Sequence, residues 1–365
     1  MKKKVCVIPG DDAMPEAVNP TVEILEKMGM GIEFIKLPGG EEADRIYGKA
    51  PLPKLPDEIK KAIDGSDCTV FGSTSGHNFS IPALVYLRWA SDGPDCGCHI
   101  RPIKYFKGAR AALRDPEGID WIIIREGREG LYVQMQGQLK DLAPLGHILK
   151  PGFTSSWDWQ RKGTFAIRVI TEENTLKIVR FGCEVARKRK AQGYPGKVTI
   201  VEKYNMLNVN GEYFRKIAED VVKKEYPDLI YEQFILDDFA RRLVERAHSL
   251  DVAIMANEHA DVLSDAAAAT IGGLGFGYSG CYGDKYAYFE PSAGSFPRAT
   301  GLNIINPTGM LLSSVLMLEY LGLEKEAQRL ENAVKAVYAE GKVLPQDQGG
   351  KASTTQFCDA VKSKL

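Results

Sequence analysis

The chain carries almost no excess of either charge. Its 47 lysines and arginines stand against 48 aspartates and glutamates, so the formal net charge is −1. A nucleic-acid-binding module needs a basic surface to neutralise phosphates, usually with aromatic residues among the basic ones. The sequence contains no such stripe. This argues against nucleic acid as a partner.

Long apolar runs are equally scarce. The basic opening MKKK is followed by about six apolar residues, fewer than the roughly 7–15 of a signal peptide. No stretch approaches the roughly 18 apolar residues of a membrane span. The seven cysteines are scattered and odd in number, so we expect reduced thiols rather than a disulfide framework. Together these absences predict a cytoplasmic protein with no membrane partner.

Apolar strand patterns alternate with helical patterns along most of the sequence. This rhythm predicts an α/β fold with much parallel sheet, and 365 residues are enough for roughly two domains. Residues 133–163 lack periodicity and are expected to form an arm or an excursion at a subunit contact. The expected strands are 3–9, 68–73, 101–106, 121–126, 197–203, 229–236 and 251–256, and the expected helices are 15–29 (with Pro20 bending it or delaying its start), 80–90, 172–192, 209–225, a helix starting near 237, one through 265–272, and two or three more towards the C-terminus.

The stretch GFGYSG at 275–280 matches G-x-G-x-x-G, the glycine pattern of a dinucleotide-binding turn. That pattern has its meaning only between a strand and a helix, where the pyrophosphate lies at the helix N-terminus. Here an alanine-rich helical segment precedes it, and CYGDKYAYFEP, which has the pattern of a strand, follows. We therefore expect a tight connection and not a pyrophosphate cradle.

Three aspartates are candidate metal ligands. Asp261 and Asp265 are four residues apart near the start of a predicted helix, which places both carboxylates on one helix face, close enough to share a hard cation. Asp237 begins another helix directly after a strand, and strand C-termini are where ligands bind in α/β sheets. The alternative is that all three are ordinary helix caps and first-turn acids.

Three arginines, a lysine and a tyrosine are also candidate site residues, and several of them lie at the ends of predicted strands, as Asp237 does. Arg101 opens one predicted strand, Arg125 closes another, and Arg88 lies in a helix; a guanidinium binds carboxylates with a rigid fork of donors. Structural ion pairs would explain these arginines equally well. Lys203, at the end of an apolar strand, and Tyr132 are candidate proton-transfer groups.

The motifs resemble, in order and over nearly the whole chain, those of the metal-dependent β-decarboxylating dehydrogenases. That family includes isocitrate, homoisocitrate, 3-isopropylmalate and tartrate/malate dehydrogenases. An ordered set of this kind is far more specific than any single motif. The matching segments are VIPGDDAMPEAV, LRWASDGPDCGCHIRPIKYF, IIIREGREGLY, VEKYNML, NEHADVLSDAAAATIGGLGFG, FEPSAGSFPRATGLNIINPTGMLLSS and VLPQDQGGKASTTQFCDAV.

The resemblance implies a fold of two α/β domains that share a mixed central sheet, distinct from the Rossmann fold. The large, cofactor-side domain would comprise 1–100 and 272–365. The small dimerisation and metal/substrate domain would comprise 101–271, with an arm or clasp around 133–165. A dimer would be required, because in this family the lysine and one aspartate of each site come from the neighbouring subunit.

The resemblance also implies a role for each candidate residue. The expected function is oxidative decarboxylation of a substituted 2-hydroxy-3-carboxy acid to a 2-oxo acid and CO₂, with reduction of NAD(P). The alternative is a non-catalytic regulatory or structural subunit with weakened dinucleotide binding. The implied sites are Tyr132 (acid) and Lys203 (base); Arg88, Arg101, Arg125, Leu84 and Asn205 for substrate; Asp237, Asp261 and Asp265 for Mg²⁺ or Mn²⁺; and Gly294, Ser295, Arg298 and Asn306 for the cofactor.

The cofactor segment departs from the family pattern. Ala293 replaces the histidine of the family's His-Gly, and Arg298 stands where NAD-dependent members carry an aspartate for the adenine ribose. A basic residue there suits a 2′-phosphate and favours NADP. It is equally compatible with weakened dinucleotide binding, which keeps the alternative function open.

The substrate segment departs as well. Isocitrate enzymes carry serine and asparagine where this chain has Pro82 and Leu84, so isocitrate is disfavoured and an alkylated malate is favoured. Arg128 conflicts with this, because it would reach an extra anionic group. The spacing between Arg88 and Arg101 is three residues longer than in the family, and the segment with Cys96, Cys98 and His99 is expected to be a loop insertion rather than a metal site.

Overall fold

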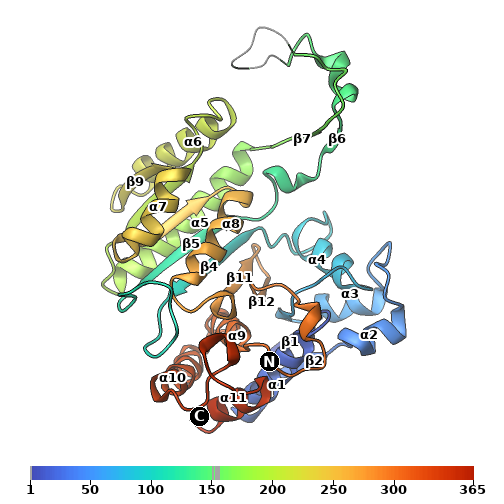
Figure 1. Cartoon of the computed structure of the whole chain (residues 1–365), viewed down its shortest axis with the longest axis vertical. Helices are drawn as coiled ribbons and strands as arrows, with labels where there is room; N and C mark the ends of the chain where they lie inside the picture. The colour runs from blue at the N-terminus through green and yellow to red at the C-terminus, as the bar shows by residue number, and fades with distance from the viewer. Residues whose placement is uncertain (1, 150–151, 153–156) are drawn as a thin grey trace.

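Ten strands in the described residues form one sheet, in the order β2-β1-β3-β12-β11-β4-β5-β10-β8-β9. The computed structural model describes residues 2–149, 152 and 157–365 (Figure 1). The strands of this sheet are β1 (Lys4–Ile8), β2 (Glu33–Lys36), β3 (Cys68–Phe71), β4 (Cys98–Lys104), β5 (Asp120–Glu126), β8 (Lys197–Glu202), β9 (Ile230–Ile235), β10 (Val252–Met255), β11 (Tyr278–Tyr282) and β12 (Ala287–Pro291).

The sheet is mixed, and its antiparallel part lies in the middle. Strands β2, β1, β3 and β12 are parallel neighbours, as are β5, β10, β8 and β9. Between these groups, β11 pairs antiparallel with β12 and β4, and β4 pairs antiparallel with β5. The α/β prediction with a shared mixed sheet is confirmed.

Alternation along the strands assigns the helices to layers, because successive side chains point to opposite faces. In β1, Val5 and Val7 pack in one core with α1, α9, α10 and α11, whereas Cys6 and Ile8 pack with α2, α3 and α4. At the other end of the sheet, α7 and α8 share the first core, and α5 and α6 cover the opposite face. These helices are α1 (Met14–Lys27), α2 (Gly40–Tyr47), α3 (Asp57–Asp64), α4 (Ser80–Arg88), α5 (Glu172–Ala191), α6 (Asn210–Glu225), α7 (Leu236–Glu245), α8 (Asn257–Ala269), α9 (Thr308–Tyr320), α10 (Glu324–Glu340) and α11 (Thr354–Lys362).

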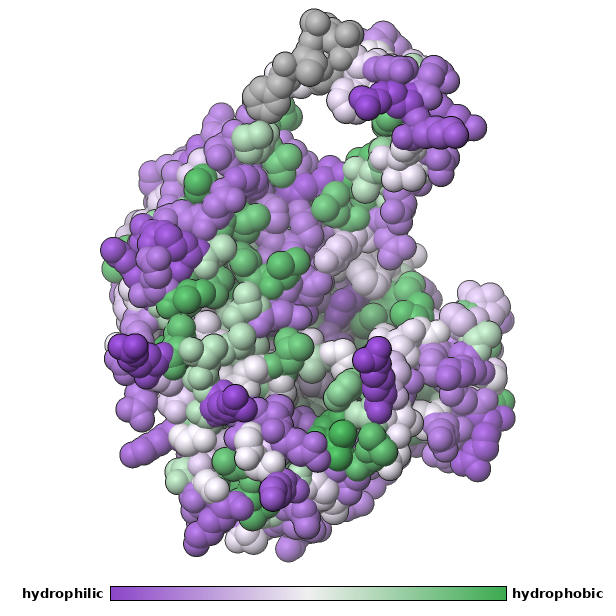
Figure 2. Space-filling model, viewed as in Figure 1, coloured by the Kyte–Doolittle hydropathy of each residue, from purple (hydrophilic) through white to green (hydrophobic). Residues whose placement is uncertain are grey.

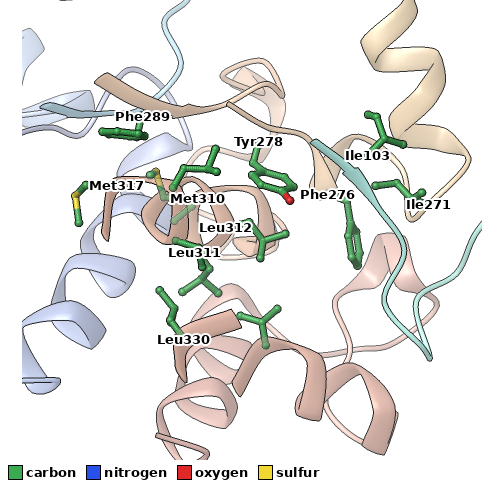
Figure 3. Packing of buried hydrophobic residues seen from close by; sticks show 14 of the residues in the cluster. Ile103, Ile271, Phe276, Tyr278, Phe289, Met310, Leu311, Leu312, Met317 and Leu330 are labelled. Atoms are coloured by element: carbon green, nitrogen blue, oxygen red, sulfur yellow. The ribbon is translucent and has the colours of Figure 1, made fainter. Parts of the chain in front are cut away.

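The centre of the larger core is α9, which is apolar on all sides and buried from Thr308 to Leu318. Figure 3 shows its residues packed between the sheet and α10, with Phe276 and Tyr278 beside them. Because α9 contacts β11 and β12 on one side and α10 on the other, it holds these two strands against the C-terminal helices.

Three local expectations need correction. β4 begins at Cys98, so Arg101 lies inside the strand rather than at its start. CYGDKYAYFEP forms two strands, β11 and β12, joined by a turn that contains Gly283. α1 begins at Met14 and contains Pro20, so its start is not displaced downstream. The sequence patterns did not predict β2, α2 or α3.

The described residues between 133 and 166 leave the body of the molecule as a two-stranded excursion. β6 (Gln136–Gln138) pairs antiparallel with β7 (Thr164–Ala166), and Figure 1 shows these strands projecting away from the sheet. The predicted arm at 133–163 therefore has this shape in its described part, while 150–151 and 153–156 lie outside the described residues. Its place at a subunit contact stays a prediction, and so does the division into 1–100 plus 272–365 and 101–271.

The core beneath the C-terminal segment offers a test of this packing. Phe357 in α11 is fully buried and lies 5.4 Å, centroid to centroid, from the ring of Tyr338. We expect Phe357→Ala to lower the free energy of unfolding by about 3–5 kcal/mol in urea denaturation. The matched control is Asp359→Ala, two residues away and exposed, which should change it by less than about 0.5 kcal/mol. Equal effects of the two changes would contradict this description of the core.

Candidate active site

Two buried arginines from adjacent antiparallel strands converge on one carboxylate. Arg101 in β4 and Arg125 in β5 are 6% and 5% exposed. Arg101 Nη1 lies 3.2 Å from Asp261 Oδ1, and Arg125 Nη1 donates to the same oxygen. On the other oxygen, Oδ2, the Tyr132 hydroxyl lies at 3.0 Å. Four of the residues singled out from the sequence therefore meet at one point above the sheet.

α8 supplies the carboxylate and holds the arginines. It packs over β5 and β4, with Asp261 in its second turn rather than at its start. Asn257, the first residue of α8, accepts a hydrogen bond from Arg125 Nε at 2.9 Å. Ser264 accepts one from Arg101 Nη1. The guanidinium groups are thus fixed from several directions before any ligand is present.

The two aspartates of α8 differ in their electrostatics. Burial acts to raise the pKa of Asp261, but the guanidinium groups of Arg125 and Arg101 and the Tyr132 hydroxyl outweigh it and lower that pKa. For Asp265, partial desolvation raises the pKa, Arg101 opposes the shift, and the neighbouring Asp261 carboxylate adds to it. Two adjacent carboxylates, one of them lacking a hydrogen-bonded cation among the described residues, suit a divalent ion that prefers oxygen ligands.

Lys203 and Asp237 form a second group. They follow the neighbouring parallel strands β8 and β9, whose carboxyl ends lie at the same edge of the sheet. Lys203 Nζ donates to the Asp237 carboxylate, and this hydrogen bond lowers the pKa of Asp237. Asn205 lies exposed in the turn that follows Lys203.

The two groups do not combine into one metal site within a single chain. Among the described residues, no cluster of three His, Cys, Asp or Glu side chains is arranged to hold a metal ion. Asp261 and Asp265 lie one turn apart on α8, whereas Asp237 is hydrogen-bonded to Lys203. A site with all three aspartates needs a second copy of the chain or a rearrangement of this one.

Arg88 occupies a third position. It ends α4, is buried, and donates to Glu290 at 2.5 Å and to the Tyr288 hydroxyl. Burial acts to lower the pKa of Arg88, but the nearby Tyr288 and Glu290 raise it above its usual value. Unlike Arg101 and Arg125, it makes no hydrogen bond or ion pair with Asp261 in the described structure.

The exposed side of α4 is apolar. Ile81 and Val85, one helical turn apart, are 37% and 43% exposed, and Leu84 beside them is partly buried. Arg128, the residue that conflicted with an apolar substrate, forms an ion pair with Asp95 at 2.5 Å. Asp95 belongs to the inserted segment, so the insertion neutralises the extra arginine.

A cavity of about 910 Å³ lies between α1, α9 and the segments at 272–275 and 291–296. It is large enough for a drug-sized ligand or a cofactor. Of the expected cofactor residues, Gly294 and Asn306 line the cavity and Ser295 is buried. Arg298 is exposed, two residues after Phe296, which also lines the cavity. The fit to a dinucleotide is mixed, because apolar walls suit flat rings but Arg298 is not among the lining residues.

The glycine stretch contributes to this cavity, although not as a dinucleotide-binding turn. It runs from α8 into β11, in the predicted order of helix then strand. Gly275 lines the cavity, and a Cβ there would lie 2.6 Å from Asp347 Oδ2 and 2.7 Å from Asn306 Nδ2. Only glycine fits at this position without displacing those side chains.

Four polar residues near the candidate site were not selected from the sequence as site residues. Glu290 follows the Phe of FEP, and Asp347 lies within LPQDQGG, so the quoted motifs contained a signal for both. Arg110, on the cavity wall, carries no such signal. His99 was assigned to a loop insertion, yet Cys98 and His99 are the first residues of β4 and are buried.

A family model described as isocitrate/isopropylmalate dehydrogenase matches residues 4–361. The 3-isopropylmalate/3-methylmalate dehydrogenase of Methanocaldococcus jannaschii is 36% identical over 363 residues, which cover 99% of this chain and 98% of that protein. The isocitrate/homoisocitrate dehydrogenase of Thermus thermophilus is 32% identical, covering 100% and 99%. The crystal structure of isocitrate dehydrogenase from Methylococcus capsulatus matches with a TM-score of 0.83 at 27% identity, covering 99% of both chains.

The fold, the buried arginine pair and the similarity to these relatives together define the chain as an α/β dehydrogenase. It belongs to the isocitrate/isopropylmalate dehydrogenase family, which confirms the resemblance found in the sequence. The family acts on small hydroxy acids with a divalent metal ion and a nicotinamide cofactor. These findings give no support to the alternative of a non-catalytic subunit. Within the described ranges, no helix has the length and apolar character needed to cross a membrane.

Glu126, beside Arg125 in β5, provides a pH-dependent test of the site. It is 3% exposed, and burial raises its pKa from 4.5 to about 7, although the N–H groups of Glu129 and Arg128 oppose the shift. Because folding favours the neutral carboxyl, the contribution of Glu126 to stability is most favourable below about pH 4.5 and falls as the pH rises towards 7. The free energy of unfolding of Glu126→Gln, relative to that of the wild type, should therefore rise by about 2–3 kcal/mol between pH 5 and pH 8.

Calorimetric unfolding across that pH range measures the difference, with exposed Glu117→Gln as the matched control. The control should follow the wild type at every pH. If the difference in the free energy of unfolding between Glu126→Gln and wild type stayed constant from pH 5 to pH 8, Glu126 would be ionised throughout, contrary to its buried position.

Proposed function

We propose that this protein oxidises a 3-alkylmalate with NAD(P) in the presence of Mg²⁺ or Mn²⁺ and releases CO₂ and a 2-oxo acid. One observation carries the proposal: Arg101 and Arg125, both buried, converge on Asp261 beside Asp265. Such a pair of guanidinium groups can bind substrate carboxylates, and the adjacent Asp261 and Asp265 would hold the divalent cation beside them. The family assignment makes this reading of the geometry the best supported one.

The apolar face of α4 indicates the substrate side chain. Arg88 and the exposed Ile81 and Val85 lie at three- and four-residue spacings, so a carboxylate at Arg88 would place the C3 substituent against apolar side chains. Arg128, the extra arginine that would attract a third carboxylate, is already paired with Asp95. Hence an alkyl substituent is favoured over the carboxylates of isocitrate, in keeping with the name of the relative from Methanocaldococcus jannaschii.

The proton transfers are assigned to Lys203 and Tyr132. Lys203 takes the proton of the C2 hydroxyl as the hydride leaves C2, and the C3–carboxylate bond then breaks to release CO₂. Tyr132 returns a proton to C3; burial and the Asp261 carboxylate raise its pKa, so it holds that proton at neutral pH. When bound, the metal ion would act as a Lewis acid on the C2 oxygen and the nicotinamide would accept the hydride.

A complete site is proposed to form between two copies of the chain. Within one chain, Lys203 and Asp237 stand apart from Asp261 and Asp265, so the partner subunit's Lys203 and Asp237 would complete each site. Apolar side chains support an interface nearby, since Figure 2 shows them gathered over α7 and α8. Val262 in α8 is 67% exposed and Val244 in α7 is 51% exposed, which favours burial against a second copy.

The cavity beside α1 and α9 is proposed to take the dinucleotide. Gly294 and Asn306 on its wall would hold the cofactor, and Asp347 adds a carboxylate that hydrogen-bonds Asn306 at 3.0 Å. Ser295 would support the same loop. Arg298, exposed and basic, would favour the 2′-phosphate of NADP.

The first test is turnover of purified protein, followed by the absorbance of the reduced nicotinamide. We expect 3-methylmalate or 3-isopropylmalate to exceed isocitrate at least about tenfold in kcat/KM, with loss of turnover in EDTA and recovery with Mg²⁺. Lys203→Ala should lower kcat at least about a hundredfold. The matched control is exposed Lys61→Ala in α3, which should behave as wild type. Failure of every malate, isocitrate and homoisocitrate to reduce either cofactor would refute the proposal.

The shared site has its own test, which is subunit complementation. Lys203→Ala and Asp261→Asn should each be inactive alone. Mixed as dissociated and reassociated subunits, they should recover about a quarter of the wild-type rate, because half the dimers are mixed and each mixed dimer has one intact site. No recovery in a mixture that contains verified mixed dimers would show that each site lies within one chain.

A further inference from the structure

His99 lies beside the arginines of the proposed substrate site, on the same face of the sheet. In the register of the sheet it is directly opposite Arg125 of β5 on one side and Cys281 of β11 on the other. Two residues further along β4 is Arg101, whose side chain points to the same face. His99 therefore lies on the same face of the sheet as the arginine pair and next to it.

The hydrogen bonding of His99 leaves one ring nitrogen bare. Nε2 lies 3.3 Å from the carbonyl oxygen of Cys96 and must donate to it, since a carbonyl only accepts. Nδ1 of the neutral ring is then an acceptor, and it is buried without a partner in the part of the chain that the structure describes. Arg101 Nε, a buried donor two residues away, is also unpartnered among those residues.

The ring is also neutral and tightly enclosed. Burial and the positive charges of Arg88, Arg125 and Arg101 hold the pKa of His99 well below its usual value. A Cβ on Gly127 would overlap the imidazole, and Gly127 itself is tied to the inserted segment by its N–H to the carbonyl oxygen of Gly97 at 2.8 Å. The insertion and Gly127 together therefore leave room for this ring and fix its position.

We propose that His99 is a positioning residue for substrate binding: its bare Nδ1, together with the unpartnered Arg101 Nε–H, holds a bridging hydroxyl or water that fixes the Arg101 guanidinium for a 2-hydroxy dicarboxylate. A group that donates to Nδ1 and accepts from Nε satisfies both buried atoms at once, which neither can achieve alone. The inference rests on the proposed function for the class of ligand. It adds His99, a residue at the start of β4, to the groups proposed to bind the substrate.

Calorimetric titration of malate, 3-methylmalate and 3-isopropylmalate with Mg²⁺, without NAD(P), tests this in the full chain. His99→Phe keeps the ring shape but no acceptor, and should weaken binding of the best ligand about tenfold, or about 1.4 kcal/mol. His99→Asn puts an oxygen near the position of Nδ1 and should recover most of that loss. In turnover, His99→Phe should raise KM about tenfold and change kcat less than about twofold.

A double-mutant cycle separates this role from a merely structural one. Gly127→Ala displaces the imidazole without changing it, and should weaken binding in the wild-type background but add nothing in the His99→Ala background. Wild-type affinity in His99→Phe would overturn the inference, as would additive effects of Gly127→Ala and His99→Ala. If wild type binds a malate but never reduces NAD(P), the proposed function fails while His99 is still tested. If no malate binds, both fail.

Discussion

The convergence of Arg101 and Arg125 on Asp261 is the interaction on which the rest of the site depends. Two guanidinium groups in a buried pocket repel each other, and burial with Arg101 nearby lowers the pKa of Arg125 to about 10. The shared carboxylate offsets that repulsion, so removal of Asp261 would leave two unpaired buried charges. The antiparallel pairing of β4 with β5 brings the arginines side by side, and α8 brings the aspartate over them. The sheet topology thus determines the electrostatics.

Much of this could be predicted from local sequence patterns. Apolar strands and amphipathic helices follow one another clearly enough that most elements and the α/β class were expected. Arg125, Lys203 and Asp237 were noticed because each lies where a strand ends or a helix begins. The order of the quoted motifs then indicated the family, and the family model confirmed it. Polar residues at strand ends can therefore be recognised as candidate site residues even when the sequence does not show which residues they contact.

The remainder depended on pairing across the sheet, which a single sequence does not contain. CYGDKYAYFEP has the composition of one strand, but its Gly283 lies in the turn between two antiparallel strands. The start of β4 was misplaced because a segment rich in glycine and cysteine has the composition of a loop. In fact Cys98 pairs with both β5 and β11, and this tertiary pairing outweighs local preference. Likewise, nothing in the spacing reveals that Asp95 neutralises Arg128.

The placement of Lys203 and Asp237 explains why one chain holds only part of the proposed chemistry. The lysine that we propose as the base has to meet the substrate, yet in a single chain Lys203 is hydrogen-bonded to Asp237 at the edge of the sheet. Asp261, meanwhile, is saturated by two arginines and a tyrosine. Lys203 and Asp237 balance each other, and the charges of the two arginines are offset once Asp265 is counted with Asp261, so neither group forces the other to approach. In the proposed mechanism, a substrate dianion would offer Arg101 and Arg125 new anionic partners, and the Asp261 carboxylate would then be available to hold a metal ion. On this view, substrate binding and assembly of the full carboxylate set are the same event.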